Sequence, residues 1–256
     1  PVNSGVSAAR NLALDMVTGD YVYMMDSDDA MSENCLQLMV DSVQRNPGVD
    51  FVQGTMVSIP YNSDYERKSF KDIDVIKGND RIRDLFYELQ INVTDKLFSV
   101  DFVRRNKLSF LGLHVHEDDL WSYYSYRAAQ LIAIVHEPTY IHYIHEGSLM
   151  TTLSPEDDRE NWYKALGILD KEIEDPHGSN LEKYYTGKLP RYYDGTPEWE
   201  ALGDAAVAKL KDHGHRIDAF ILRRALARRS EYYGYWLKNY RNRPRAVQLM
   251  AILKHW

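Results

Sequence analysis

An apolar run that ends in a group of carboxylates is the feature of this sequence best suited to chemistry. Residues 21–25 read YVYMM, and Asp26, Ser27, Asp28 and Asp29 follow directly. Such a run is typical of a strand buried on both faces of an α/β sheet, and these sheets bind ligands at the carboxyl ends of their strands. Carboxylates placed there can hold Mg²⁺ or Mn²⁺, which bridge to phosphate. A solvated turn would explain the same residues, because short motifs often occur by chance.

A second acidic group consists of Glu117, Asp118 and Asp119 and begins an expected helix near 119–129. One of these carboxylates could act as a general base that takes a proton from an acceptor hydroxyl. Acids in a first helical turn are also favoured by the helix dipole, so a structural explanation is equally good. Both interpretations stay open on this pattern alone.

Three histidines, His136, His142 and His145, gather in one aromatic segment. Residues three apart on a strand point to opposite faces, so we do not expect His142 and His145 to share a metal ion. We interpret His136 and His142 as ordinary polar side chains and keep His145 as a candidate ligand-binding residue.

Alternating helical and strand patterns predict an α/β domain around these residues. The first helix lies within 3–20, where Ser4 or Ser7 can cap it and Gly19 can end it. Its predicted apolar stripe is Val6, Ala9, Ala13, Met16 and Val17. A second helix is capped by Ser32 and stops before Pro47.

Further along the chain the pattern predicts strands at 49–59, 96–98 and 131–135. The remaining expected helices cover 79–89, a segment capped by Ser99, 119–129 and 155–174, and the chain is helical from Glu198 onward. Two segments are predicted to be irregular. They are 60–78, a surface loop, and 176–197, a linker rich in Pro, Gly and Tyr.

Composition limits the class of protein. With 44% hydrophobic and 27% charged residues, the sequence is typical of a globular protein. No apolar run approaches the roughly 18 residues that span a bilayer, so we do not expect an integral membrane protein. Cys35 is the single cysteine, which excludes an internal disulfide framework and a zinc site of several cysteines. We therefore expect a cytoplasmic protein.

Charge is distributed unevenly along the chain. Residues 1–215 carry a net charge of −15 and residues 216–256 one of +8. Basic and aromatic side chains mix over 216–245, which suits a peripheral contact with anionic lipid at the inner face of the plasma membrane. The other interpretation is a structural amphipathic helix. In that case the helix would pack three side chains onto the main domain, namely Leu222, Leu226 and Trp236. The acidic remainder argues against nucleic-acid binding.

The order of the motifs resembles family 2 of the glycosyltransferases, in particular bacterial enzymes that build surface polysaccharides. That family shows Asn-x-Gly-x-x-x-Ala-Arg-Asn, an apolar strand ending in Asp-x-Asp-Asp, Lys-Leu-Phe, a Glu-Asp pair at a helix start, and a tyrosine-rich segment with a late serine. The matching positions, in the same order, are Asn3, Gly5, Ala9-Arg10-Asn11, YVYMMDSDD at 21–29, Asp95-Lys96-Leu97-Phe98, Glu117-Asp118, and YIHYIHEGSLM at 140–150. The match fades after about Glu174.

The resemblance implies a GT-A-like, Rossmann-type mixed sheet flanked by helices. Residues 1–153 would be the C-terminal part of the catalytic domain, and 154–256 a mainly helical extension with a basic-aromatic tail. The implied activity moves a sugar from a nucleotide-diphosphate donor, expected to be a UDP-sugar, to a saccharide or lipid-linked acceptor. Inversion at the anomeric centre, a Mn²⁺ or Mg²⁺ cofactor and a role in cell-surface polysaccharide synthesis belong to the same expectation.

The resemblance also implies a role for each matched residue. Asp118 matches the catalytic base, and Glu117 beside it would position the acceptor or the loop. Asp28 would bind the cation directly, and Asp26 would contact the ribose or a metal-bound water, so that both belong to the metal motif. The implied donor-binding residues are Asn3, Gly5, Arg10, Asp26 and His145. A structural alternative for Arg10 is an ion pair that steadies the aspartate loop.

The sequence opens at Pro1, directly before the Asn-x-Gly stretch. The family places strand–helix–strand units that hold the nucleotide base ahead of that stretch. We therefore expect an N-terminally truncated domain, with an incomplete sheet that exposes an edge. A chain of this kind should be weakly active or inactive by itself, and ordinary turnover in a transfer assay would contradict that expectation.

Two other classes of protein share some of these features. A metal-dependent phosphohydrolase also carries Asp-x-Asp after an apolar strand, but Ala30 stands where such an enzyme prefers Thr or Val. A non-catalytic module that binds polysaccharide or a partner protein would fit a truncated chain. Metal-dependent binding of a nucleotide sugar distinguishes the transferase from that module.

Overall fold

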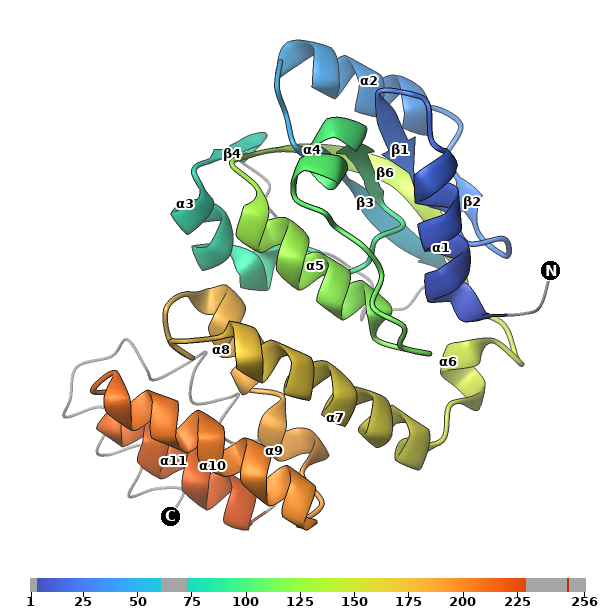
Figure 1. Ribbon diagram of the computed structural model, residues 1–256. Helices are drawn as coiled ribbons and strands as arrows, with labels where there is room; N and C mark the ends of the chain where they lie inside the picture. Colours follow the sequence, from blue (N-terminus) through green and yellow to red (C-terminus); the bar gives the residue numbers. More distant parts are fainter. Residues whose placement is uncertain (1–3, 61–72, 229–247, 249–256) are drawn as a thin grey trace. The chain divides into compact units, whose positions relative to one another are not determined.

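The computed structural model describes residues 4–60, 73–228 and 248. The chain divides into two compact units, Pro1–Asn161 and Trp162–Trp256, and Figure 1 shows the elements of each. Among the described residues, no helix combines the length and the apolar character needed to cross a membrane.

A mixed sheet of six strands forms the centre of the first unit (Figure 1). The strands follow the order β1-β5-β3-β6-β2, and β4 also pairs with β6. Their bounds are Tyr21–Tyr23 for β1, Ala30–Met31 for β2, Phe51–Ile59 for β3, Val75–Lys77 for β4, Lys96–Ser99 for β5 and Leu131–Tyr143 for β6. β5 is antiparallel to both β1 and β3, and β3 is parallel to β6. The carboxyl ends of β1, β3 and β6 therefore lie at the same edge of the sheet.

Successive side chains of a strand point to opposite faces, and the two faces of this sheet have different cores. Val52 of β3 belongs to an aliphatic cluster with Cys35 and Met39 of helix α2 (Cys35–Arg45). Phe51, the preceding residue, belongs to an aromatic cluster on the other face. The ring contacts of that cluster are Phe51–Phe98 at 5.0 Å, Phe51–Tyr126 at 5.4 Å and Phe98–Trp121 at 5.5 Å. Tyr126 and Trp121 come from helix α5 (Glu117–Ala128), so α2 and α5 cover opposite faces.

The close approach of β3 to β6 requires a glycine. A Cβ atom at Gly54 would overlap the side chains of Thr139 and Met39. The pairing register of the two strands shifts at the same point, on either side of Thr55. This bulge redirects the end of β6, which carries Tyr140 toward the aspartate loop.

The first unit has further helices. They are α1 (Gly5–Met16), α3 (Asn79–Asp84), the 3-10 helix η2 (Phe86–Glu88), α4 (Val100–Arg105) and α6 (Leu149–Thr152). The predicted cap of α4 is confirmed, because the Oγ of Ser99 accepts a hydrogen bond from the backbone N–H of Phe102 at 3.3 Å.

Three expectations for this unit are wrong. β1 is half-buried, with a strand neighbour on one side among the described residues, and is therefore not a strand buried on both faces. The predicted apolar stripe of α1 does not pack, since Met16 is exposed and the buried residue of this helix is Ser7. The segment 60–78 contains β4, and its part 61–72 lies outside the described residues.

Helices make up the second unit. Helix α7 (Pro155–Glu172) leads into it, and the others are α8 (Asn180–Thr186), α9 (Leu189–Tyr192), α10 (Pro197–Asp212) and α11 (Arg216–Ala227). The predicted linker 176–197 is wrong, because it contains α8 and α9. Ser179 begins α8 by accepting a hydrogen bond from the N–H of Leu181 at 3.2 Å, and Leu181 and Tyr185 are buried.

Helix α11 packs closely on α10. A Cβ atom at Gly203 of α10 would lie 2.7 Å from a methyl group of Leu226. Leu222 and Leu226 are buried, and Leu226 lies against α10 of the same unit; the predicted packing onto the main domain stays a prediction. Trp236 and the rest of the basic-aromatic segment beyond residue 228 lie outside the described residues.

Candidate functional site

The predicted site residues come from four places in the first unit. Asp26 and Asp28 follow β1, and His145 follows β6, at the edge where the carboxyl ends of these strands meet. Glu117 and Asp118 begin α5, and Arg10 lies in the middle of α1. Figure 1 shows the start of α5 and the helix α1 near this edge.

Arg10 connects the two acidic motifs. One of its terminal nitrogens lies 2.8 Å from Glu117 Oε1 and 2.8 Å from Asp118 Oδ1, and the other lies 2.8 Å from Asp26 Oδ1. The guanidinium group is also placed over the ring of Phe110, 5.2 Å from its centre. Carboxylates separated by more than ninety positions in the sequence thus converge on one side chain that is only 13% exposed.

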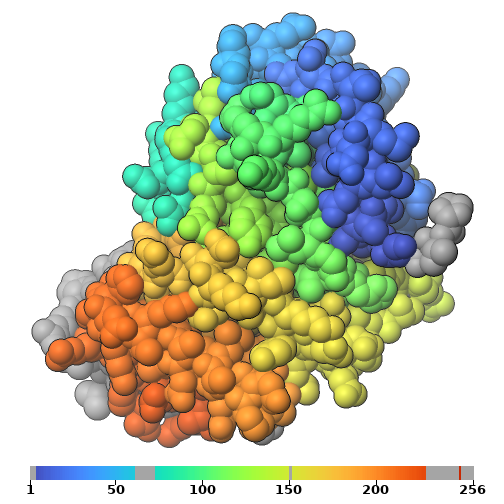
Figure 2. Space-filling model, in the orientation of Figure 1, coloured from blue at the N-terminus to red at the C-terminus, as the bar shows by residue number. Residues whose placement is uncertain are grey.

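Polar contacts place α1, and with it Arg10. The Oγ of Ser7 donates to the carbonyl oxygen of Leu113 at 3.0 Å. Asn11 forms two bonds with the backbone of Phe110, each 2.8 Å long. In Figures 1 and 2, α1 (blue) lies beside the green segment that precedes α5. The helix therefore docks through the face of Ser7, Arg10 and Asn11 rather than through apolar residues.

Asp118 is the carboxylate whose proton affinity suits general base catalysis. Burial raises the pKa of Asp118 to about 7, although the charge of Arg10 lowers it. Its second oxygen accepts the backbone N–H of Val93 at 3.2 Å. Burial also raises the pKa of Glu117, against the charge of Arg10. A base with a pKa near neutrality can hold and release a proton at cellular pH.

The start of α5 is fixed by His116, whose φ of 65° lies in the left-handed region. Such a conformation is uncommon for a residue other than glycine and is maintained by surrounding contacts. His116 Nδ1 lies 3.3 Å from Asp119, and Nε2 lies 2.6 Å from Asp158. Burial alone lowers the pKa of His116, but its bonds with Asp119 and Asp158 outweigh burial and raise it.

We expect His116→Asn to destabilise the fold more at pH 5.5 than at pH 8.5. The raised pKa means that the protonated imidazole stabilises the folded state below pH 6.5, and that this contribution is lost as the pH rises through the folded-state pKa. Asparagine tolerates the left-handed backbone, so the substitution removes mainly the charged contacts. The loss at pH 5.5 should be about 1–2 kcal/mol in urea unfolding. The exposed His114→Asn is the control, and an equal loss at both pH values would contradict the prediction.

Asp29 and Tyr140 hold the aspartate loop onto the end of β6. The carboxylate of Asp29 is almost fully buried and accepts the Tyr140 hydroxyl at 2.7 Å and the backbone N–H of Tyr143 at 2.9 Å. His142 Nδ1 lies 3.1 Å from the same carboxylate. The Tyr140 oxygen in turn accepts the backbone N–H of Asp26 at 3.2 Å. These contacts fix where Asp26 and Asp28 point.

Neither Asp29 nor Tyr140 was among the predicted site residues. The sequence signal for Asp29 is the acid at the fourth position of the Asp-Ser-Asp-Asp run, and the structure shows that this acid is buried. His136 lies apart from the site and contacts Asp74 at 3.0 Å. The contacts of His136 and His142 agree with their interpretation as ordinary polar side chains.

Asp28 and His145 form an open part of the site. His145 Nε2 lies 3.1 Å from Asp28 Oδ2, and both side chains are about half exposed. The hydrogen bond from His145 lowers the pKa of Asp28, and the same bond raises the pKa of His145. An exposed carboxylate beside an imidazole is suited to binding a charged ligand from solution.

Gly5 is the first residue of α1. Gly5 has a φ of 81°, a conformation that side-chain-bearing residues rarely adopt, so a glycine is needed where the chain enters this helix. Asn3 lies outside the described residues.

The mixed sheet flanked by helices matches the fold of GT-A type glycosyltransferase structures. Residues 1–109 match the family model described as Glycosyl transferase family 2. The resemblance of the sequence to that family is thereby confirmed over this part of the chain.

Solved structures similar to this chain come from S. aureus TarS. A crystal structure of TarS 1–349 is 17% identical, with a TM-score of 0.63 over 91% of this chain and 71% of that one. The same segment in complex with UDP-GlcNAc is 18% identical, with a TM-score of 0.58 over 92% and 72%. Similarity at this level of identity shows the fold. No curated protein sequence matches the chain.

Proposed function

We propose that this chain transfers a sugar from a UDP-sugar to an acceptor hydroxyl, with inversion of the anomeric centre. The observation that carries the proposal is the convergence of Asp26, Glu117 and Asp118 on Arg10. The crystal structures of TarS 1–349 with UDP-GlcNAc and with UDP support the choice of donor. The proposed acceptor is a saccharide or lipid-linked saccharide of the cell surface, which rests on the family resemblance.

Asp118 takes the proton in the proposed reaction. The acceptor oxygen forms a bond to the anomeric carbon while the bond from that carbon to the diphosphate oxygen breaks. The acceptor proton passes to Asp118, and the electron pair of the broken bond leaves on the diphosphate. One base on the face opposite the leaving group is sufficient for a single displacement, which inverts the centre. Glu117 remains on Arg10 and keeps the start of α5 in place.

The residues of the aspartate loop fit a divalent cation. Asp28 and Asp26 supply carboxylate oxygens, the donor type that Mg²⁺ and Mn²⁺ prefer, and Asp28 is open to solvent. Two carboxylates do not enclose an ion, and Mg²⁺ commonly completes its shell with substrate phosphate and water. When bound, the cation would stabilise the charge that develops on the leaving diphosphate.

The proposed donor-binding residues surround this loop. His145 beside Asp28 carries a positive charge when protonated and could contact a phosphate. Arg10 forms an ion pair with Asp26. This is the structural role given above as the alternative to donor binding for Arg10. Gly5 would act through the backbone entry to α1, and the proposed role of Asn3 rests on the family resemblance alone. We also propose that residues 216–245 bring the protein to the inner face of the plasma membrane, where lipid-linked acceptors occur.

We expect Asp28→Asn to weaken metal-dependent binding of UDP. In the complete gene product, calorimetric titration with UDP and Mn²⁺ should show at least a tenfold loss of affinity, or about 1.4 kcal/mol. Removing the carboxylate charge should disfavour the cation and, with it, the diphosphate. The exposed Asp20→Asn is the matched control and should bind as the unchanged protein does.

Two outcomes of this titration would contradict the proposal. The metal role of the aspartate loop is wrong if UDP binds equally well after EDTA treatment. A non-catalytic module is favoured if saccharides bind, UDP does not, and Mn²⁺ has no effect on either.

A further inference from the structure

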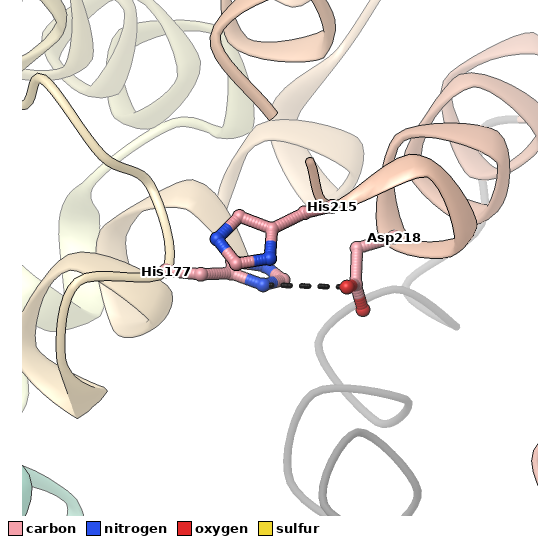
Figure 3. A group of neighbouring side chains, drawn as sticks. All are labelled: His177, His215 and Asp218. Carbon is pink, nitrogen blue, oxygen red and sulfur yellow. Dashed lines mark ion pairs between the residues drawn. The ribbon is translucent and has the colours of Figure 1, made fainter. Parts of the chain in front are cut away.

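Two histidines and an aspartate in the second unit form a cluster with no part in the proposed transfer site. His177 lies between α7 and α8, His215 directly precedes α11, and Asp218 lies in the first turn of α11. Each offers one ligand atom, and these three atoms all lie within 4.8 Å of one another. Figure 3 shows the three side chains side by side, with the ion pair between His177 and Asp218 marked.

We propose that His177, His215 and Asp218 bind a zinc ion. His177 Nδ1 lies 3.4 Å from Asp218 Oδ2. A charge-assisted hydrogen bond between such groups is shorter, about 2.7–2.9 Å. Ligand atoms at about 2.0–2.1 Å from a tetrahedral zinc ion are separated by about 3.3–3.4 Å. The separation of His177 Nδ1 from Asp218 Oδ2 therefore equals that of two ligands of one tetrahedral ion, and a long direct ion pair is the competing interpretation.

Asp175 contacts the ring of His215 and the backbone of His177. Its Oδ1 lies 3.3 Å from His215 Nε2, and the same oxygen accepts the backbone N–H of His177 at 2.9 Å. With Nε2 turned toward Asp175, the Nδ1 of His215 faces His177 and Asp218 (Figure 3). Metal-binding histidines commonly present their second ring nitrogen to a carboxylate in this way, which fixes the orientation of the ring.

The burial of this cluster and its donor atoms favour zinc over Mg²⁺ or Mn²⁺, the cations proposed for the aspartate loop. The side chain of His177 is fully buried, and those of Asp218 and His215 are 10% and 22% exposed. Two imidazole nitrogens and one carboxylate oxygen are typical zinc ligands, whereas Mg²⁺ prefers oxygen ligands alone.

Zinc at this position would tie the start of α11 to the segment between α7 and α8. The two segments are far apart in the sequence, so a shared ion closes a loop that contains α8, α9 and α10. A structural metal of this kind adds its binding free energy to the stability of the folded unit. The competing explanation is an ion pair between Asp218 and a protonated His177, which needs no metal.

The test is a titration of metal-free protein with zinc chloride. We expect one zinc ion per chain by calorimetry and a rise in the midpoint of thermal unfolding. His215→Ala and Asp218→Asn should each lower zinc affinity at least tenfold. Two variants are controls that should bind zinc normally. They are His213→Ala, an exposed histidine two positions away, and Asp28→Asn, which removes the other candidate metal site.

Equal zinc affinity in all four variants would overturn the proposal, as would failure of the unchanged protein to bind zinc. X-ray absorption of the zinc-loaded protein gives an answer even if the cluster variants do not fold. Two imidazole ligands at about 2.0 Å support the site, and a shell of oxygen atoms alone refutes it. None of these outcomes depends on sugar transfer, so the proposed function can fail or succeed separately.

Discussion

Replacing Asp118 with asparagine should reduce sugar transfer by about 10²- to 10⁴-fold in the complete gene product, with UDP binding preserved. Asparagine has nearly the same shape and can still contact Arg10, but it cannot accept a proton. The measurement is single-turnover transfer from a UDP-sugar, together with UDP affinity by calorimetry. Asp15→Asn, an exposed acid of α1, is the control for a change of charge.

The pKa of Asp118 gives this prediction a second readout. Because burial raises that pKa to about 7, transfer by the unchanged protein should fall as the pH drops below 7 and the base becomes protonated. The same shift means that ionised Asp118 destabilises the folded state. This destabilisation is absent below pH 4, grows between pH 4 and 7, and reaches its full value above pH 7.

Asp118→Asn should therefore be at least as stable as the unchanged protein at pH 8. A variant that has lost transfer but not stability points to lost chemistry, since unfolding is then excluded. Transfer within threefold of the unchanged protein would show that Asp118 is not the base.

Replacing Arg10 with alanine should lower the free energy of unfolding by about 3 kcal/mol at pH 8. Removing one partner of a buried ion pair costs about 3–5 kcal/mol, and the partial exposure of Asp26 places the estimate at the lower end. Glu117 and Asp118 would be left buried without a cation. The measurement is urea unfolding, with the exposed Arg45→Ala as the matched control, expected within about 0.5 kcal/mol of the unchanged protein.

The loss caused by Arg10→Ala should be smaller at pH 5 than at pH 8. Arg10 lowers the pKa of both Glu117 and Asp118, so its removal lets these acids take up protons and lose their unfavourable charge at the lower pH. Arg10→Lys should retain part of the stability, because one ammonium group cannot contact three carboxylates in the planar geometry of guanidinium. A loss at pH 8 no greater than that of Arg45→Ala would show that the three contacts contribute little.

Sequence patterns predicted those strands and acidic motifs whose structure is decided by residues close together in the sequence. The long strand at 49–59 and the helix at the Glu117-Asp118 pair both follow from residue types within a few positions. The convergence of Asp26 with Asp118 was expected from the family order of motifs, and the structure shows it through Arg10. The catalytic and metal roles of these residues stay predictions.

The failures arose where distant contacts decide the structure. Apolar periodicity cannot identify a helix such as α1 that docks through Ser7 and Asn11, because those partners lie about a hundred positions away. Proline and glycine suggested a linker at 176–197, yet burial of Leu181 and Tyr185 stabilises two short helices there. The role of Asp29 likewise depends on Tyr140, which the bulge at Thr55 brings into reach.

The three contacts of Arg10 have a thermodynamic consequence for any ligand of the aspartate loop. A ligand that draws Asp26 away from Arg10 leaves the guanidinium charge paired with fewer carboxylates. The interaction of Arg10 with Asp118 then changes, and with it the affinity of Asp118 for a proton. Linkage is reciprocal, so protonation of Asp118 must change the affinity of the loop for that ligand by the same factor. Ligand binding to the aspartate loop and protonation of Asp118 are thus one coupled equilibrium.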